Sequence, residues 1–254
     1  MKNFFIYIFA FSFFSVLIFS QVNTEKHRTP KDAVGFSGHI EVDANIKTGN
    51  TEKTEVGVEG RGDYKTPRSL TFIIFQSDYE WVGSTRSSDM GLLHLRHVEN
   101  FNDSLMIEFF GQIDYNKKIL LNNRELIGAG LRYRLFNFSN GDIHIGSAFM
   151  FEHENYNLDE TDSHPDEVQT SRWSNYLTYF QAVNANVTLS SVLYYQPAFS
   201  DFGDVRILNE NNMKAGLSQS LSVLVTFRLR YDSIPPDEIE KTDTETRIGL
   251  SYSF

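Results

Sequence analysis

Apolar and polar residues alternate along most of the chain, and the last segment, residues 244–254, shows the pattern clearly. Its even-numbered positions from 246 onward are apolar or amphipathic, and its odd-numbered positions are charged or small: Thr246, Ile248, Leu250, Tyr252 and Phe254 against Glu245, Arg247, Gly249, Ser251 and Ser253. A period of two is typical of a strand with one apolar face and one polar face. The segment is therefore predicted to be a strand.

The same period predicts ten more strands: 36–46, 54–64, 90–99, 105–115, 121–135, 143–156, 171–180, 187–196, 205–217 and 221–231. A further strand is predicted at 69–79, where the period fails, and the twelve together cover most of residues 34–254. In the segment 69–79 both sets of positions are apolar, so its faces are left unassigned. The predicted fold is all-β, with about twelve antiparallel strands.

The connections between these strands differ on the two sides. One side has only short connections: 65–68, 100–103, 137–142, 182–186 and 218–220. The other side has the long ones, 80–89, 157–170, 197–204 and 232–243, besides the short turns 47–50 and 116–118. Short periplasmic turns, longer external loops and an even strand number are typical of a transmembrane β-barrel of the outer membrane. Closure is expected because an open sheet edge in hydrocarbon costs several kcal/mol for each unsatisfied backbone group.

The N-terminal segment has the pattern of a targeting signal. Lys2 precedes an apolar run at 4–19, and the small residue Ser20 is followed by polar residues. This predicts a signal peptide at 1–20, with an uncleaved anchor as the alternative, and a short periplasmic lead at 21–33. Because the chain has no Cys, a lipoprotein or a disulfide scaffold is not expected.

Composition limits the partners. The formal net charge is −10, and no basic stripe offsets it, so nucleic acid is not an expected partner. Mean hydropathy is −0.33, and after residue 19 no apolar run approaches the roughly 18 residues that a membrane helix needs. A membrane barrel remains compatible with this composition because only every second residue of a strand faces lipid.

Charged residues on the polar faces are expected to form a cluster in the lumen. Its predicted members are Glu108, Asp114, Arg124, Arg132, Arg134, Arg206, Glu210, Arg228, Arg230, Glu245 and Arg247. A tight turn centred on Gln219 would place Glu210 opposite Arg228. If Tyr231 paired with Thr244, Arg230 would lie opposite Glu245, and Arg228 opposite Arg247.

Several phrases resemble a known family. They are G-A-G-L-R-Y-R-L at 128–135, Y-Y-Q-P at 194–197, D-V-R-I at 204–207, Y-D-S-I-P-P at 231–236 and K-T-D-T at 241–244. Together with the terminal Phe they resemble the domain-of-unknown-function family of salt-induced outer-membrane proteins, over roughly 34–254. The resemblance implies an integral protein of the bacterial outer membrane with no established activity and no catalytic residue. For outer-membrane barrels it implies that the aromatic pair Tyr252 and Phe254 is the signal that the barrel-assembly machinery reads.

Candidate chemistry is sparse. No HExxH motif or cysteine ligand occurs, so no metal site and no cofactor are expected. The acidic segment 152–167 is interpreted as a solvated loop, with Ca²⁺ or Mg²⁺ binding near lipopolysaccharide as the alternative. For an outer-membrane phospholipase-like hydrolase, the available His/Ser pairs are His144 with Ser147 and His97 with Ser104; neither has an orienting Asn or Asp placed by sequence, so an enzyme is not expected.

The function predicted from the sequence is therefore a structural or small-solute-binding barrel with a charged, largely filled lumen, and a link to envelope stress. A narrow diffusion channel is the main alternative. A soluble lipocalin-type barrel is disfavoured by aromatic residues at strand ends, such as Tyr64, Tyr115 and Tyr231, which are typical of membrane girdles. Outer-membrane lipids, lipopolysaccharide and the assembly machinery are the expected partners, and the oligomeric state stays open.

Overall fold

A computed structural model describes Thr24, Lys26, residues 34–49 and residues 52–254. These residues form twelve strands and one short 3₁₀ helix. In chain order they are β1 Gly35–Lys47, β2 Lys53–Lys65, β3 Ser69–Val82, β4 Thr85–Asn100, β5 Leu105–Asn116, η1 Lys117–Ile119, β6 Leu121–Phe138, β7 Gly141–Tyr156, β8 Glu167–Ala182, β9 Val187–Pro197, β10 Val205–Gly216, β11 Leu221–Asp232 and β12 Thr242–Ser253.

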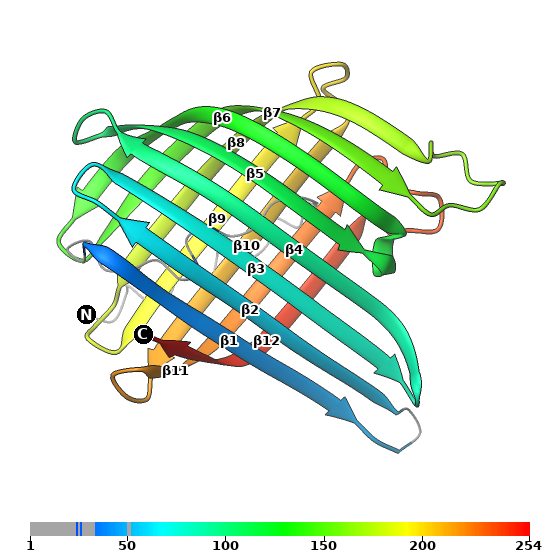
Figure 1. Cartoon of the computed structure of the whole chain (residues 1–254), viewed down its shortest axis with the longest axis horizontal. Helices are drawn as coiled ribbons and strands as arrows, with labels where there is room; N and C mark the ends of the chain where they lie inside the picture. The colour runs from blue at the N-terminus through cyan, green and yellow to red at the C-terminus, as the bar shows by residue number, and fades with distance from the viewer. Residues whose placement is uncertain (1–23, 25, 27–33, 50–51) are drawn as a thin grey trace, which may run out of the picture.

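Each strand pairs antiparallel with the next, and β12 pairs with β1, so the sheet is a closed barrel (Figure 1). The predicted twelve-strand antiparallel barrel is confirmed. The predicted signal peptide at 1–20 lies outside the described residues. No helix among the described residues is long and apolar enough to span a membrane.

Several strands are longer than predicted. The expected loop at 80–89 is wrong: β3 and β4 run on to a two-residue turn at Gly83 and Ser84, where Gly83 has φ +60°. The sequence concealed this extension because the polar residues at 84–89 read as a loop, whereas they lie on a strand end near the rim, where polar side chains are tolerated. Similarly, β8 begins at Glu167, which shortens the expected loop 157–170 to 157–166.

The strand at 69–79, whose faces were unassigned, has apolar residues on both sides for two different reasons. Phe72 and Ile74 point into the lumen and are buried with Val98 and Met106. Ile73 and Phe75 lie on the outer surface, and both are more than two-fifths exposed. The alternation fails at this level because the lumen itself is packed with apolar side chains.

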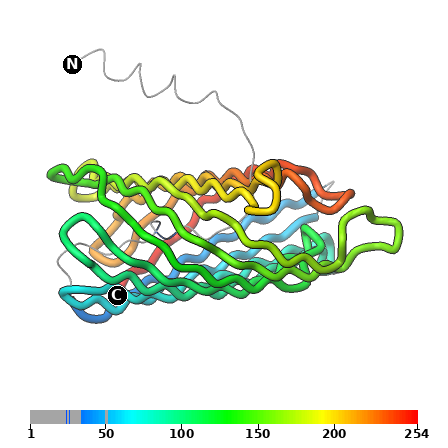
Figure 2. Tube along the Cα trace, turned by 90° about the horizontal axis from the view of Figure 1, so that it is seen from above, coloured from blue at the N-terminus to red at the C-terminus, as the bar shows by residue number. Residues whose placement is uncertain are grey.

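The barrel is flattened, and Figure 2 shows its two walls facing each other across a narrow interior. Side chains reach across this interior. The Tyr176 hydroxyl on β8 donates to Glu108 on β5 at 2.8 Å, and Arg206 on β10 bonds Glu154 on β7 at 2.7 Å. A second apolar cluster, Tyr176, Val192, Tyr194 and Leu208, fills the lumen nearby. Much of the interior is therefore solid.

The register of the last strands is partly as predicted. Glu210 lies opposite Arg228, which confirms the register of β10 and β11. The predicted register of β11 and β12 is wrong by two residues, since Arg228 pairs with Glu245 and Arg230 pairs with Asp243. The loop is shorter than assumed: the Asp232 N–H donates to the Lys241 carbonyl at 3.1 Å, so pairing starts before Thr244. The shift places opposite charges across the ladder in place of two arginines.

The ladder that closes the barrel is short. β1 and β12 pair over four positions, from His39↔Ser253 to Val42↔Leu250, whereas β1 and β2 pair over thirteen. Above Val42 the two strands diverge within the described chain (Figure 1).

Candidate functional site

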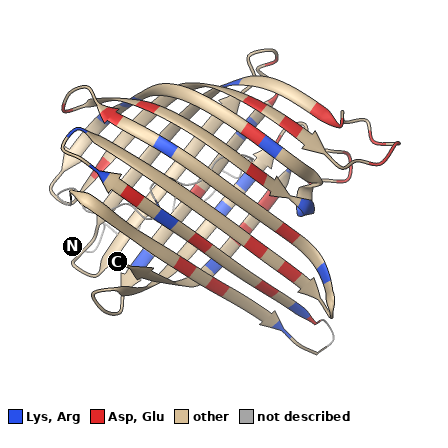
Figure 3. Cartoon of the chain, viewed as in Figure 1, with Lys and Arg blue, Asp and Glu red and all other residues tan. Residues whose placement is uncertain are grey.

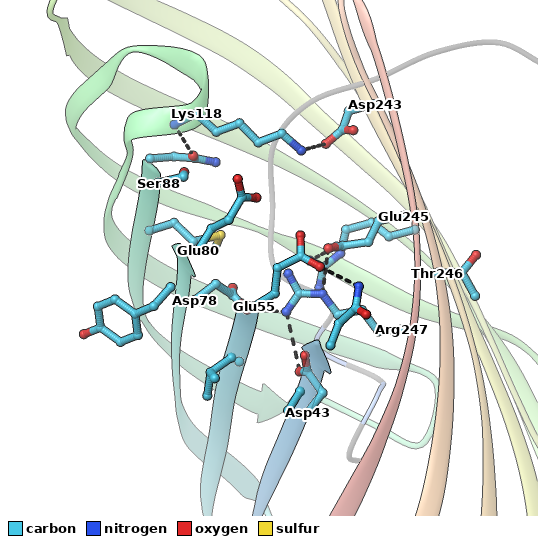
Figure 4. A pocket seen from close by; sticks show the side chains of 18 of the residues that line it. Asp43, Glu55, Asp78, Glu80, Ser88, Lys118, Asp243, Glu245, Thr246 and Arg247 are labelled. Atoms are coloured by element: carbon cyan, nitrogen blue, oxygen red, sulfur yellow. Dashed lines mark hydrogen bonds and ion pairs between the residues drawn. The ribbon is translucent and has the colours of Figure 1, made fainter. Parts of the chain in front are cut away.

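A polar cavity of about 580 Å³ opens where β1 and β12 diverge, and Figure 4 shows its lining. It lies at the end of the barrel that carries the loops 157–166 and 233–241. Four basic and six acidic side chains line it: Lys118, Arg228, Arg230 and Arg247, with Asp43, Glu55, Asp78, Glu80, Asp243 and Glu245.

Arg247 is the centre of the charge network in this cavity. It bonds Asp78 on the other side of β1 and β2, lies 3.6 Å from Asp43, and bonds Glu245 at 2.7 Å. Figure 4 shows these carboxylates converging on its guanidinium. Arg247 therefore ties β12 to β1 and β3 at a level where the backbone ladder between β1 and β12 is missing.

Arg228 supports the same wall from below. Its Nε donates to Glu210 at 2.6 Å, and its Nη1 donates to Glu245 at 3.5 Å. The Glu210 and Arg228 side chains are buried, while that of Glu245 is about one-third exposed. A buried pair of this kind is costly to break, because the partner left behind is an uncompensated charge.

The opposite wall is acidic. Glu55 and Glu80 share Lys53 at 2.8 and 2.9 Å, and Asn45 donates to Glu55 at 2.7 Å. Across the cavity Lys118 lies 3.9 Å from Asp243. Carboxylates of β1 to β3 thus face basic groups of β11, β12 and η1. Figure 3 shows the acidic residues on β1 to β4 that produce this asymmetry.

Lys26 lies one inward-facing row deeper in the lumen than the cavity. Its Nζ lies 2.7 Å from Glu41 and 2.7 Å from Glu59, which are paired on β1 and β2. That row lies between Asp43↔Gly57, which lines the cavity, and His39↔Arg61 beyond it. Lys26 is therefore buried inside the lumen, although the sequence placed 21–33 in the periplasm. The other described residue of that segment, Thr24, is also buried, and its carbonyl accepts from Arg61.

A second cavity, of about 290 Å³, lies at the opposite end of the lumen. Thr24, Arg61, Arg132 and Arg134 are among its lining residues. Because Arg61 follows the Glu41↔Glu59 row on β2, the Lys26 ion pairs lie between the two cavities. In the described part of the chain, the Lys26, Glu41 and Glu59 side chains thus separate these two cavities of the lumen.

The half of the lumen beside β7 to β10 is closed. Arg206 bonds Glu152 at 2.9 Å and Asp232 at 2.8 Å, and Arg172 bonds Glu152 and Asp204. Beside this network Pro235, Pro236 and Ile239 of the 233–241 loop line a small cavity of about 10 Å³ together with Leu121 and Tyr156 of the barrel and with charged residues of the network. At this end, the part of the chain that the structure describes encloses the cavity of about 580 Å³ in the half beside β1 to β3 and β11 to β12.

The predicted lumen cluster is divided among these regions. Arg228, Arg230, Glu245 and Arg247 line the cavity, and Glu210 supports Arg228. Asp114 and Arg124 form an ion pair at 2.9 Å. Arg206 belongs to the closed half, Glu108 bonds Arg96 at 3.2 Å in the packed centre, and Arg132 and Arg134 line the second cavity. The prediction placed these charged residues in one cluster, whereas in the structure they are distributed along the whole lumen.

Sequence reasoning missed several residues of the site. Asp43, Glu55 and Glu80 were not connected with Arg247, because they lie far from it in the chain and line the same cavity only when the barrel closes. Lys26 was missed because its segment shows no periodicity. The acidic segment 152–167 is only in part a loop: Glu152 and Glu154 lie on β7, buried against arginines. No group of three or more His, Asp or Glu in the described chain is arranged to hold a metal ion.

The His/Ser pairs considered for hydrolysis do not come together. His144 is buried in the lumen, whereas Ser147 lies on the outer face, where its hydroxyl accepts from Trp173 Nε1 at 2.8 Å. His97 is on the outer face with Thr71 Oγ1 2.8 Å from its Nδ1, and Ser104 lies in the turn beyond β4. Neither serine is activated by its nominated histidine.

The family model described as "Protein of unknown function, DUF481" matches residues 40–254. The chain belongs to this family. The match covers every strand except the start of β1, so the charged cavity lies within the family domain. No curated protein matches the sequence.

Solved outer-membrane barrels share the fold at low sequence identity. The COG4313 outer membrane channel from Pseudomonas putida F1 is 9% identical, with a TM-score of 0.52 over 92% of this chain and 99% of that one. The translocator domain of autotransporter NalP from Neisseria meningitidis is 11% identical, with a TM-score of 0.50 over 88% and 90%. The NanC porin is 7% identical, with a TM-score of 0.50 over 85% and 98%. These likenesses concern the fold alone.

Proposed function

We propose that the chain is an integral protein of the bacterial outer membrane whose cavity, at the external end, binds small solutes that carry both a positive and a negative charge. The barrel fold and the apolar outer surface support the location. The observation that carries the function is the cavity of about 580 Å³, in which carboxylates on β1 to β3 face basic groups on β11, β12 and η1. Asp243 and Glu245 lie among the basic groups, so the cavity presents groups of both charges, which complement a ligand with two opposite charges.

Binding can be tested with phosphoethanolamine, a small molecule with an ammonium group and a phosphate. Isothermal titration calorimetry on the refolded protein should detect binding to the parent. Arg230→Gln and Glu80→Gln, which remove one charge from opposite walls, should each weaken it about tenfold or more, since a hydrogen bond to a charged group contributes roughly 1.5 to 3 kcal/mol. Glu167→Gln, outside the cavity, is the matched control. Absence of binding, or equal affinities in all four proteins, would contradict the proposal.

A narrow diffusion channel is the second candidate, and the pair of cavities at opposite ends of the lumen favours it. Lys26 lies between them, so Lys26→Ser should widen the path and leave the Glu41 and Glu59 carboxylates facing it. Under this hypothesis the variant shows larger, cation-selective conductance in a planar bilayer, whereas Lys241→Ser in an external loop behaves like the parent. Identical traces from all three would exclude Lys26 as the constriction.

A further inference from the structure

The closing ladder between β1 and β12 ends well before either strand does. In the register of Ile40↔Tyr252, Ala44 would pair with Ile248, and Ile46 with Thr246. All four residues lie on described strands, but the ladder stops at Val42↔Leu250. By contrast, β12 pairs with β11 over eleven positions on its other side. The wall of the barrel therefore has a slot along the upper part of its seam.

Backbone N–H and C=O groups of β1 and β12 face this slot. Gly38 and Phe254 exchange both backbone hydrogen bonds, at 3.0 Å each, so alternate residues from Gly38 onward present their N–H and C=O groups to β12. At Ala44 and Ile46 these groups face the slot, and on β12 those of Ile248 do the same. Among the described residues no strand pairs with these groups across the seam, so they are open to hydrogen bonds from water or from a polar group of another molecule.

The charged cavity opens into the slot. Its lining includes Ala44, Val56 and Ile248, whose side chains belong to the outer face of the barrel, as well as Asp43 and Arg247, which point inward. Figure 4 shows Thr246 of β12 on the outer side of the strand from Arg247. The site is thus charged within the lumen and apolar at its lateral mouth.

The slot lies at the level of an aromatic girdle. Across β1, β2 and β3, Ala44 shares a row with Val56 and Tyr79. The next outward row is Ile46, Thr54 and Trp81, and the rings of Tyr79 and Trp81 lie 5.9 Å apart. Tyr and Trp concentrate where lipid headgroups meet the acyl region. The lateral mouth is therefore at the depth of the headgroups.

We propose that this slot is a lateral entry through which the cavity binds a membrane amphiphile with a zwitterionic headgroup. The headgroup binds in the cavity between Glu55 and Glu80 on one side and Arg230 and Lys118 on the other, and the apolar tail stays outside among Ala44, Val56 and Ile248. The inference rests on the proposed function, because the headgroup uses the same charges as a soluble solute. It adds the class of ligand and the route.

A disulfide across the slot tests the route, and the chain is suited to it because it has no cysteine. Ala44→Cys with Ile248→Cys joins the two strands where they now diverge. Ile40→Cys with Tyr252→Cys is the matched control, because these residues already pair. Both bridges lie on the outer face, and the difference in gel mobility between unboiled and boiled protein shows that each variant is a folded barrel.

The probe is phosphatidylethanolamine with a photoreactive diazirine on its acyl chain, in vesicles with the refolded protein. After illumination, mass spectrometry should find label on the slot edges of the parent. Forming the disulfide in the Ala44→Cys/Ile248→Cys protein should lower this labelling at least fivefold, and cleaving the disulfide should restore it. The Ile40→Cys/Tyr252→Cys control should be labelled equally with and without its disulfide. Equal labelling of the locked and unlocked slot would overturn the proposal.

Soluble phosphoethanolamine separates the two hypotheses. If the locked protein binds it like the parent and lipid labelling is unaffected by the lock, lateral entry is wrong and the proposed function stands. If the lock abolishes lipid labelling but no protein binds phosphoethanolamine, lateral access is supported and the charged cavity is not the headgroup site; that result contradicts the proposed function and the ligand class.

Discussion

Replacing Glu210 with Gln tests the wall of the cavity most directly. Glu210 accepts from Arg228 Nε at 2.6 Å, and both side chains are buried. The substitution keeps the shape of the side chain and removes its charge. Removing one partner of a buried ion pair costs about 3 to 5 kcal/mol, and Arg228 retains Glu245 at 3.5 Å, so the lower end applies. We expect Glu210→Gln to lose about 3 kcal/mol of folding stability.

The assay is guanidinium unfolding of the refolded barrel. With a slope of about 3 kcal/mol per M, a loss of about 3 kcal/mol moves the midpoint down by about 1 M. Glu167→Gln is the control. The Glu167 side chain is 60% exposed and pairs with His153 at 2.9 Å, and the loss of folding stability on changing such a surface residue stays within about 0.5 kcal/mol. Chloride should not rescue Glu210→Gln, because Arg228 lies opposite Glu245 and not opposite a second arginine.

The double variant Glu210→Gln/Arg228→Gln completes the test. Without either charge no ion is left buried alone, so the double variant should be more stable than Glu210→Gln. The charge pair does not stabilise this wall if Glu210→Gln unfolds at the same midpoint as the parent. The same holds if the stability lost by the double variant equals the sum of the losses of Glu210→Gln and Arg228→Gln measured separately.

Three further predictions concern other parts of the barrel. Deleting Phe254 should lower the amount assembled in the outer membrane far more than Ser253→Asp, as quantified in membrane fractions, if the terminal aromatic is the assembly signal. Hydrogen bonds from the Ser163 hydroxyl and backbone N–H lower the pKa of Asp237. This contact therefore stabilises the two loops at pH values above the unfolded-state pKa, and the stabilisation is lost as pH falls through the lower folded-state pKa. Asp237→Asn should speed hydrogen exchange of the loop that carries Ser163 at pH 7, and the difference from the parent should vanish in strong acid. Gly130→Val should unfold at lower denaturant than the parent, because a Cβ there meets the backbone and side chain of the neighbouring strand.

The sequence predicted the fold because a barrel wall separates two environments at every residue. Alternation gave eleven of the twelve strands, and the β10–β11 register followed from a tight turn. The alternation did not predict faces or strand ends where the two environments are alike. At Phe72 and Ile74 the lumen is as apolar as the outer surface, and near the rim the polar strand ends resemble loops in sequence. The β11–β12 register failed because the 233–241 loop has no turn motif that fixes its length.

The site was less predictable than the fold. Polar parity correctly placed Arg228 and Arg247 inside, but a parity argument gives only the face of a strand and not the partner across the lumen. The contact of Arg247 with Asp78 spans β1 and β2 and depends on the closing register, which rests on four pairs. Lys26 depends on a segment with no periodic pattern at all. Contacts that exist only after closure leave no local signal in the chain.

The division of the lumen into a packed half and an open half separates the residues that serve stability from those that can serve binding. In the centre of the lumen, Glu108, Arg96 and Tyr176 form a buried network outside the lining of the charged cavity, so substitutions there should affect unfolding and leave binding unchanged. Beside β1 and β12 the ladder is short, and side chains such as Arg247 replace the missing backbone bonds. If the cavity binds ligand as proposed, Arg230→Gln and Glu80→Gln should weaken binding, whereas Glu210→Gln, which breaks a buried ion pair, should also lower stability.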